Sequence, residues 1–304
     1  MKKNLIILCF HGVTKKLKKK NLENFSGKHI HYKDFQNQIF KLKKKKFNFI
    51  AYEQVVNNIK NNIAFPKNTV CFTFDDGFMN NFKIAAPILK KNKIPAIFFL
   101  CPKNIENQEM FWVDKIEDCI NRTKKKNIVV NLKRKTFFSL KFQNEKIKCI
   151  NTIKNYCKNI NVLKKNLIIK EVIKISGILP SMKSSPNYKI ATWPIIKKTI
   201  KNKLFSLGGH SLEHDIYSNL SKLDVRKNIK KTIEIIKKKK NYKIKHFSYP
   251  KGQKMHFSRY IISELKKNNI TSCPTAIYGK NNHKDHLFNL KRIMIGFNNI
   301  KLPN

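Results

Sequence analysis

Two adjacent carboxylates stand directly after a predicted buried strand. The strand is the run TVCFTF at residues 69–74, and Asp75 and Asp76 follow it, with a glycine after them. In parallel α/β proteins, functional groups gather at the carboxyl ends of the strands, whereas a hydrophobic core gains nothing from two carboxylates. An ordinary strand-to-helix loop, in which one Asp caps the next helix, would give the same sequence. Catalysis and capping are both open interpretations of Asp75 and Asp76 alone.

Two histidines follow another predicted strand at a spacing that suits metal binding. His210 and His214 come after the run LFSLG at residues 204–208. Two imidazoles four residues apart can converge on one ion, and His is a common metal ligand near neutral pH. A carboxylate and two imidazoles, with coordination positions left open, are what hydrolytic metal chemistry requires. A pair of loop histidines without a metal is the alternative interpretation.

A third predicted strand ends in a Pro/Gly turn. The segment at 245–249 passes directly into Pro250, Lys251 and Gly252. Such a turn can point a backbone N–H toward a reacting oxygen. By itself the pattern indicates nothing more than a β-turn.

Seven short apolar runs are predicted to form the strands that position these residues. They are rich in β-branched or aromatic residues, and amphipathic helical patterns lie between them. The runs are 5–10, 69–74, 96–100, 204–208, 245–249, 270–276 and 292–296. Continuous apolar strands that alternate with helices predict an α/β protein with a parallel sheet buried on both faces. A barrel and a doubly wound sheet fit this pattern equally well.

The stretch from about 113 to 176 interrupts the alternation. It is rich in Lys, has apolar residues at helical spacing, and lies where the chain has no Gly between Gly77 and Gly177. A hairpin is expected within it, around residues 128–142. We interpret the stretch as an insertion or lid within a single catalytic domain that spans residues 1–304.

The chain of 304 residues is strongly basic, with 65 Lys and Arg residues, 18 Asp and Glu residues and a formal net charge of +47. Only five of the basic residues are Arg, and the lysines are spread from end to end. Nucleic-acid binders favour Arg and gather basic residues on one face, so nucleic acid is not an expected partner. An AT-rich genome, which favours Lys, Asn and Ile, is the preferred explanation. A functional basic surface, including peripheral contact with an anionic membrane, is the alternative.

Cysteine usage and the N-terminus bear on the compartment. The seven cysteines include no CxxC pair, and several lie in apolar runs, which is typical of buried free thiols in a reducing compartment. The N-terminal run LIILCF is short, lacks a small-residue cleavage site and leads directly into His11, so a first core strand is expected there in preference to a signal peptide. No apolar run reaches 18 residues, and no transmembrane helix is predicted. We therefore expect a cytoplasmic protein.

Taken in order, three motifs resemble those of the polysaccharide deacetylase family (carbohydrate esterase family 4, the NodB-homology domain). The family's T-F-D-D-G motif stands intact at residues 73–77, its H-[ST]-x-x-H motif is HSLEH at 210–214, and its F-x-Y-P-x-G motif is FSYPKG at 247–252. Further similarities to one branch of the family are FHGV at 10–13, PILKKNKIPAIFFL at 87–100, Trp112, Trp193 and the pair Arg292-Ile293. The resemblance covers essentially the whole chain and implies a distorted (β/α)7 barrel, similar to a TIM barrel.

The resemblance implies roles for five residues. Asp76, His210 and His214 would bind a divalent metal, zinc before other divalent transition metals. Asp75 would be the general base that takes a proton from the attacking water, and the backbone N–H of Lys251 would stabilise the oxyanion. The implied enzyme is a metal-dependent hydrolase that removes N-acetyl groups, in preference to O-acetyl groups, from a glycan or a sugar-bearing lipid intermediate. Its implied partner is an acetylated carbohydrate.

The sequence departs from the family pattern at two catalytic positions. Ser248 stands where another form of the third motif, R-x-P-Y-G, has an Arg that orients the base. The late L-x-x-H motif, whose His acts as general acid, has no clean match, so we predict that the acid is His11, at the end of the first strand. His283 and His286 are the other candidates, and a buried structural role is the alternative for His11. A catalytically silent glycan-binding or scaffold protein on the same barrel is the alternative function.

Overall fold

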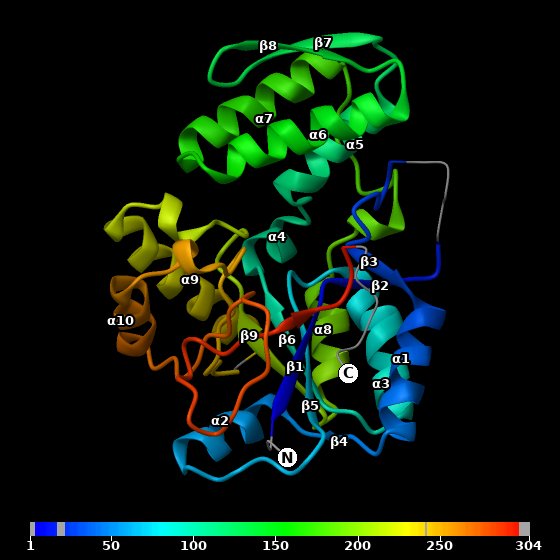
Figure 1. Ribbon diagram of the computed structural model, residues 1–304. Helices are drawn as coiled ribbons and strands as arrows, with labels where there is room; N and C mark the ends of the chain where they lie inside the picture. Colours follow the sequence, from blue (N-terminus) through cyan, green and yellow to red (C-terminus); the bar gives the residue numbers. More distant parts are fainter. Residues whose placement is uncertain (1–3, 17–21, 241, 298–304) are drawn as a thin grey trace.

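A parallel sheet runs through the centre of the molecule. The computed structural model describes residues 4–16, 22–240 and 242–297 (Figure 1). The strand order is β10–β1–β5–β6–β9, and β4 pairs with the beginning of β5. These strands are β1 (Leu5–Phe10), β4 (Asn48–Phe49), β5 (Thr69–Phe74), β6 (Ala96–Leu100), β9 (Phe205–Gly209) and β10 (Ile293–Met294). A small parallel pair joins β2 (Gly12–Thr14) and β3 (His29–His31).

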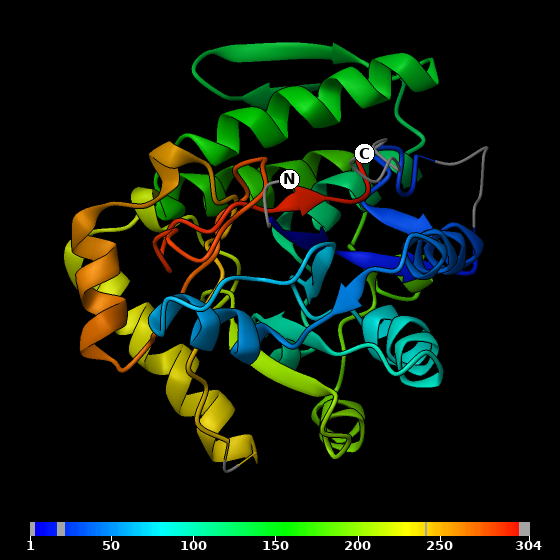
Figure 2. The ribbon, with the colours of Figure 1, turned by 60° about the horizontal axis from the view of Figure 1, so that its bottom comes forward.

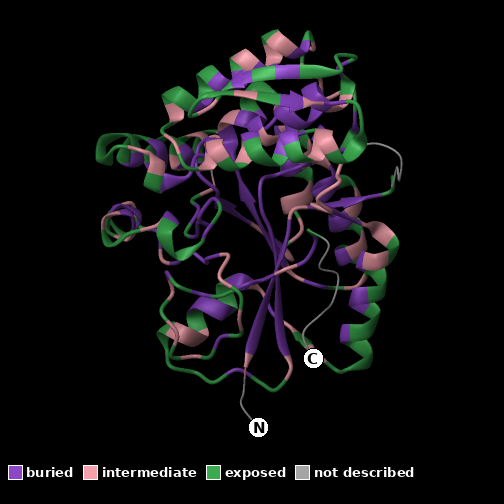
Figure 3. Ribbon diagram, turned by 45° about the horizontal axis from the view of Figure 1, so that its top comes forward, coloured by how far each residue is buried: buried purple, intermediate pink, exposed green. Residues whose placement is uncertain are grey.

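The central strands are buried on both faces. Every residue of β1, β5 and β6 is buried, and Figure 3 shows exposed residues mainly on the helices and loops around them. Long apolar runs are what both faces of a covered parallel sheet require. The strands predicted at 5–10, 69–74 and 96–100 therefore agree with the structure residue for residue. The expectation that the N-terminal run is a core strand is confirmed.

Two further segments continue the parallel wall less regularly. Phe247 and Ser272 each form one isolated parallel bridge. The sequence predicts full strands around both residues, and this is wrong in extent, because Pro250 and Pro274 follow closely and have no N–H to donate to a ladder. The irregular pairing is the distortion expected of the barrel. The predicted fold class, α/β with a distorted (β/α)7 barrel, is confirmed.

Helices cover the outside of the sheet (Figure 2). The apolar face predicted from Phe35, Ile39 and Leu42 is buried in the first of them. The helices are α1 (Tyr32–Lys44), α2 (Tyr52–Lys60), α3 (Ala86–Lys91), α4 (Pro102–Asn107), α8 (Trp193–Ile200), α9 (Lys222–Lys240) and α10 (Arg259–Lys267). Shorter turns are the π-helix η1 (Asn81–Ala85) and the 3₁₀-helices η2 (Pro186–Tyr188), η3 (Tyr217–Asn219) and η4 (Lys254–His256). In the described ranges, no helix combines the length and apolar character needed to cross a bilayer.

Three helices and a hairpin lie over the carboxyl ends of the strands, at the top of Figure 1. They are α5 (Trp112–Arg122), β7 (Asn127–Asn131), β8 (Lys135–Ser139), α6 (Gln143–Lys158) and α7 (Val162–Ser176), and we call them the insertion. Ile116, Ile128, Ile153 and Val172 belong to a hydrophobic cluster separate from that of the barrel. The antiparallel pairing of β7 with β8 confirms the expected hairpin. That the insertion acts as a lid stays a prediction.

Candidate active site

The register of the central sheet decides which side chains meet at its carboxyl edge. β1 pairs with β5 so that Phe10 lies opposite Phe74, and β6 pairs with β9 so that Leu100 lies opposite Gly209. The residues that follow these strands therefore emerge at one edge. All six site residues predicted from the sequence line one cavity of about 430 Å³, which is an ordinary size for a ligand pocket. They are His11, Asp75, Asp76, His210, His214 and Lys251.

Asp76, His210 and His214 form a set of atoms suited to a divalent metal. The Oδ1 atom of Asp76 lies 3.5 Å from Nε2 of His210 and 3.5 Å from Nε2 of His214. Nitrogen and oxygen ligands of a tetrahedral zinc ion, bound at about 2.1 Å, lie about 3.4 Å apart. Asp76 Oδ1 is also buried without a hydrogen-bond donor in the described part of the chain. The three side chains therefore fit a metal ion.

Burial shifts the pKa of all three side chains. The Nδ1–H of His210 donates to the backbone carbonyl of Ser248 at 2.9 Å, which leaves Nε2 free to act as a ligand. Burial lowers the pKa of both His210 and His214, so both imidazoles are neutral. Burial raises the pKa of Asp76 to about 8, and the negative charges of Asp75 and Asp114 add to this effect, although the positive charge of Lys28 opposes it. A bound dication would favour the ionised form of Asp76.

Asp75 is held in a different way from its neighbour. Arg292 donates to both carboxylate oxygens of Asp75, at 2.8 Å from Nη1 to Oδ1 and 2.7 Å from Nη2 to Oδ2. Ser248 Oγ accepts from Arg292 Nη2 at 2.8 Å and donates to Asp75 Oδ2 at 3.3 Å. Burial alone would raise the pKa of Asp75, but the charge and hydrogen bonds of Arg292, together with His210 and His11, hold this pKa well below its usual range. Asp75 is therefore ionised and fixed in orientation.

Lys251 offers a free backbone N–H at the rim of the cavity. Its residue has a left-handed conformation, with φ of 64°, in the turn between Pro250 and Gly252. Within the described ranges, the Lys251 N–H donates no hydrogen bond, whereas the next N–H, of Gly252, is bonded to the Pro250 carbonyl at 2.7 Å. An unpaired N–H of this kind can bind an oxygen of a substrate.

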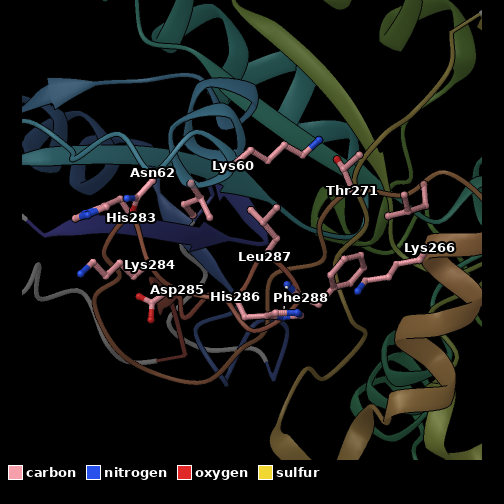
Figure 4. A pocket seen from close by; sticks show the side chains of 12 residues that line it. Lys60, Asn62, Lys266, Thr271, His283, Lys284, Asp285, His286, Leu287 and Phe288 are labelled. Carbon is pink, nitrogen blue, oxygen red and sulfur yellow. Dashed lines mark hydrogen bonds between the residues drawn. The ribbon is translucent and has the colours of Figure 1, made fainter.

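His11 lines the cavity, and the other candidate acids do not. The Nδ1 atom of His11 is buried without a hydrogen-bond partner in the described part of the molecule. The His11 ring packs edge to face against Phe297, with 5.0 Å between the ring centroids. Burial lowers the pKa of His11 to about 3, against the opposing effect of Asp75. His283 and His286 line a separate surface pocket beside α2 and α10, where Figure 4 shows them with Lys266 and Leu287.

The insertion supplies one wall of the same cavity. α5 contributes Asp114 and Glu117, and α6 contributes Asn151, Lys154 and Lys158. The floor is the carboxyl edge of the barrel. Residues more than a hundred positions apart thus face each other across one space.

A comparison with protein families places the chain. The model described as polysaccharide deacetylase matches residues 62–272, which is more than half of the sequence and includes all three motifs. The chain belongs to the polysaccharide deacetylase family. The resemblance seen in the motifs is thereby confirmed, and membership supports a hydrolase that deacetylates carbohydrates. A search of curated protein sequences finds no match.

Solved structures of deacetylases share the fold of this polysaccharide deacetylase family member. The deacetylase PplD of Streptococcus pyogenes, in complex with acetate, is 17% identical, with a TM-score of 0.63 over 97% of this chain and 93% of its own. IcaB from Ammonifex degensii is 16% identical, with a TM-score of 0.61 over 96% and 91%. A de-N-acetylase from Aggregatibacter actinomycetemcomitans is 14% identical, with a TM-score of 0.62 over 97% and 96%. Identities this low show the fold alone.

Arg292 is the site residue that sequence reasoning left without a role. The motif similarity includes Arg292, but the expected position of the base-orienting Arg is occupied by Ser248. The structure places the Arg292 guanidinium against both Ser248 and Asp75. The available signal was that Arg292, one of only five arginines, is the first residue of the last predicted strand.

Proposed function

We propose that this protein is a metal-dependent deacetylase that hydrolyses N-acetyl groups, in preference to O-acetyl groups, on a glycan or a sugar-bearing lipid intermediate. The observation that carries the proposal is the convergence of Asp76, His210 and His214 beside the Arg292-bound carboxylate of Asp75. A metal set next to a second, ionised carboxylate is the arrangement of hydrolytic sites.

Asp76, His210 and His214 would hold the metal, with zinc as the first candidate. Once bound, such an ion lowers the pKa of a water molecule and polarises a carbonyl oxygen. The protein contributes the orientation of its ligands, since the Ser248 carbonyl fixes the tautomer of His210.

Asp75 acts as the general base. Its carboxylate is charged, dry and pinned by Arg292, so it can accept the proton of the attacking water without reorienting. Arg292 is a positioning residue, because it acts through Asp75. In this assignment Arg292 orients the base, which is the role expected of the Arg that Ser248 replaces.

His11 and Lys251 complete the proposal. The Lys251 N–H stabilises the negative charge that develops on the acetyl oxygen. His11 starts the reaction as a neutral imidazole, takes over the proton that Asp75 has removed from the attacking water, and gives it to the departing amine, which leaves Asp75 ionised again. The buried and otherwise unbonded Nδ1 of His11 is the atom available for this transfer.

Two measurements on the purified protein test the proposal. Elemental analysis should find one divalent metal per chain, and an N-acetylglucosamine oligomer incubated with the protein should release acetate. Chelation should stop the release, and added zinc should restore it. A protein that retains stoichiometric metal and releases no acetate from N-acetylated or O-acetylated sugars would contradict the proposal.

The compartment stays a separate prediction. The seven cysteines are all buried and unpaired, which supports the cytoplasmic location expected from the sequence. Peripheral contact with an anionic membrane is likewise a prediction from charge. Fractionation of cells that express the protein would decide between a soluble and a membrane-associated pool.

A further inference from the structure

Most charged groups that line the cavity already have partners. Three carboxylates are paired with cations, and the fourth, Asp76, lies against the two imidazoles of the metal set. The three pairs are Asp75 with Arg292, Asp114 with Lys28 and Glu117 with Lys154. Charges paired in this way have little left to offer an ionic group on a ligand.

Two further cations in the cavity have no carboxylate partner. Lys158 is the last residue of α6, and Lys251 lies in the turn after Pro250, so the two face the cavity from the insertion and from the barrel. In the described ranges neither side chain forms a salt bridge. The Nζ of Lys158 donates only to the neutral side-chain oxygen of Asn155, at 3.2 Å.

Composition alone does not explain Lys158. The lysines of a Lys-rich surface extend into water, where a charge is well solvated, whereas Lys158 is only partly exposed. Burial, and then the like charges of Lys251 and Lys154, lower the pKa of Lys158 to about 8. Its backbone is fixed as well, because the Lys158 carbonyl accepts from Asn219 Nδ2 at 2.8 Å. The fold therefore holds a partly desolvated cation beside other cations, at an energetic cost.

We infer that the substrate carries an acidic group, a phosphate or a carboxylate, which binds between Lys158 and Lys251 while the acetamido group lies at the metal set. The inference rests on the proposed deacetylase function and specifies its substrate class. An anion in this position relieves the repulsion between the two lysines. The ammonium groups are flexible point charges, which suits either acidic group.

The geometry predicts a preference for acidic over neutral sugars. A neutral glycan would leave the partly buried Lys158 and the exposed Lys251 unpaired, whereas an acidic one binds at two points, one on the barrel and one on the insertion. Charge-assisted contacts of this kind each change binding by about 10-fold or more. The preference should weaken as ionic strength rises, because salt screens partly exposed charges.

The test compares three N-acetylated disaccharides of similar size. They are diacetylchitobiose, its phosphate ester at the reducing end, and a disaccharide of glucuronate and N-acetylglucosamine. We expect kcat/KM to be about 10-fold higher for one or both acidic sugars than for the neutral one. The two acidic arms show whether a phosphate or a carboxylate is preferred.

Lys158→Gln is the decisive variant, since Lys158 takes no part in the chemistry. It should lower kcat/KM for the acidic sugar about 10-fold, mainly by raising KM, and leave turnover of diacetylchitobiose unchanged. Lys148→Gln is the matched control, because Lys148 lies on the same helix, is exposed and does not line the cavity. Lys148→Gln should leave kcat/KM unchanged for both the acidic sugar and diacetylchitobiose.

Two outcomes separate this inference from the proposed function. Equal kcat/KM for neutral and acidic sugars, with Lys158→Gln affecting both alike, would overturn the inference and leave the deacetylase intact. Absence of acetate release from all three sugars would count against the deacetylase. In that case, calorimetric binding of the acidic disaccharide to the wild type and to Lys158→Gln decides the inference by itself, and equal affinities overturn it.

Discussion

The two walls of the cavity are built by different means. On the barrel side, Asp75, Asp76 and His210 directly follow strands whose register brings their ends together. On the insertion side, Glu117 and Lys158 come from helices with a hydrophobic cluster of their own. The barrel wall carries the proposed chemistry and the insertion wall the proposed choice of substrate. Because the two walls are built separately, charged residues of the insertion can be replaced, which changes the substrate preference, without moving the catalytic residues of the barrel.

The insertion is fastened to the barrel at a few buried polar contacts. Glu117 of α5 accepts from the Tyr188 hydroxyl at 3.0 Å and from the Asn24 backbone N–H at 3.1 Å, both outside the insertion. Within the insertion, Glu117 also accepts from Lys154 Nζ of α6 at 3.0 Å. Lys28 reaches Asp114 of α5 at 2.5 Å. Substitutions on the barrel side should therefore lower the turnover of every substrate. Substitutions on the insertion side should leave the metal content unchanged.

The largest effects are expected at the metal and base positions. His210→Ala should lose both metal and activity, because the remaining ligands cannot close the site. Asp75→Asn should retain the metal and lose about 10²–10⁴-fold in kcat, because an amide cannot accept the proton. Elemental analysis measures the metal content of each variant, and acetate release measures its kcat. Near-normal kcat in Asp75→Asn would show that the base is assigned wrongly.

His11→Ala tests the proposed acid. We expect kcat to fall by about 10²–10⁴-fold with metal content unchanged, since a leaving amine needs a proton. His283→Ala, in the separate pocket of Figure 4, is the control and should keep its activity. If His11→Ala only lowers the melting temperature and turns over normally, His11 is structural.

Arg292→Ala should produce the largest loss of stability. The side chains of Arg292 and Asp75 are 1% and 3% exposed, so the variant leaves an uncompensated buried carboxylate. Breaking a buried pair in this way costs about 3–5 kcal/mol. Arg134→Ala, at an exposed position, should change the free energy of unfolding by no more than about 0.5 kcal/mol. Urea denaturation of both variants measures the difference, and equal losses would refute the role of the pair.

Glu117→Gln should loosen the insertion and leave the metal bound. The amide oxygen can still accept hydrogen bonds, but the charge opposite Lys154 is lost, for about 1.5–3 kcal/mol. Glu234→Gln, at an exposed position of α9, is the control. Hydrogen exchange should show faster opening confined to α5, α6 and α7. Uniformly faster exchange across the barrel would contradict the separation of the two walls.

The smallest expected effect is the pH dependence contributed by Lys158. Its pKa in the folded protein, about 8, lies below the ordinary 10.5 because of burial, Lys251 and Lys154. The folded state therefore bears the cost of the charge below about pH 8 and loses this cost as pH rises toward 10.5. Lys158→Gln should be more stable than the wild type below pH 8, by less than about 1 kcal/mol after allowance for solvent screening. The gain should vanish near pH 10 in thermal melts.

The sequence predicts the barrel side better than the insertion side, and the reason is locality. Asp75 and His210 follow apolar runs whose burial and ends are readable from neighbouring residues. The contact of Arg292 with Asp75 depends on β10 pairing beside β1, which no local pattern encodes. Lys158 looks like any lysine at a helix end until the fold sets it opposite Lys251. Long-range juxtaposition, rather than residue type, is the missing information.

Four residues of the three motifs have left-handed backbones without being glycine. They are Asp76, Ser211, His214 and Lys251, with φ of 76°, 60°, 63° and 64°. Each such conformation costs about 1 kcal/mol or more for a residue with a side chain. A heat-selected library of the metal-free protein should therefore accumulate glycine at these positions, Asp76→Gly first, because that change also removes a buried carboxyl group. Selection for heat resistance alone would therefore yield inactive variants, because the replaced residues belong to the site. Directed evolution of this protein must select for turnover at every round.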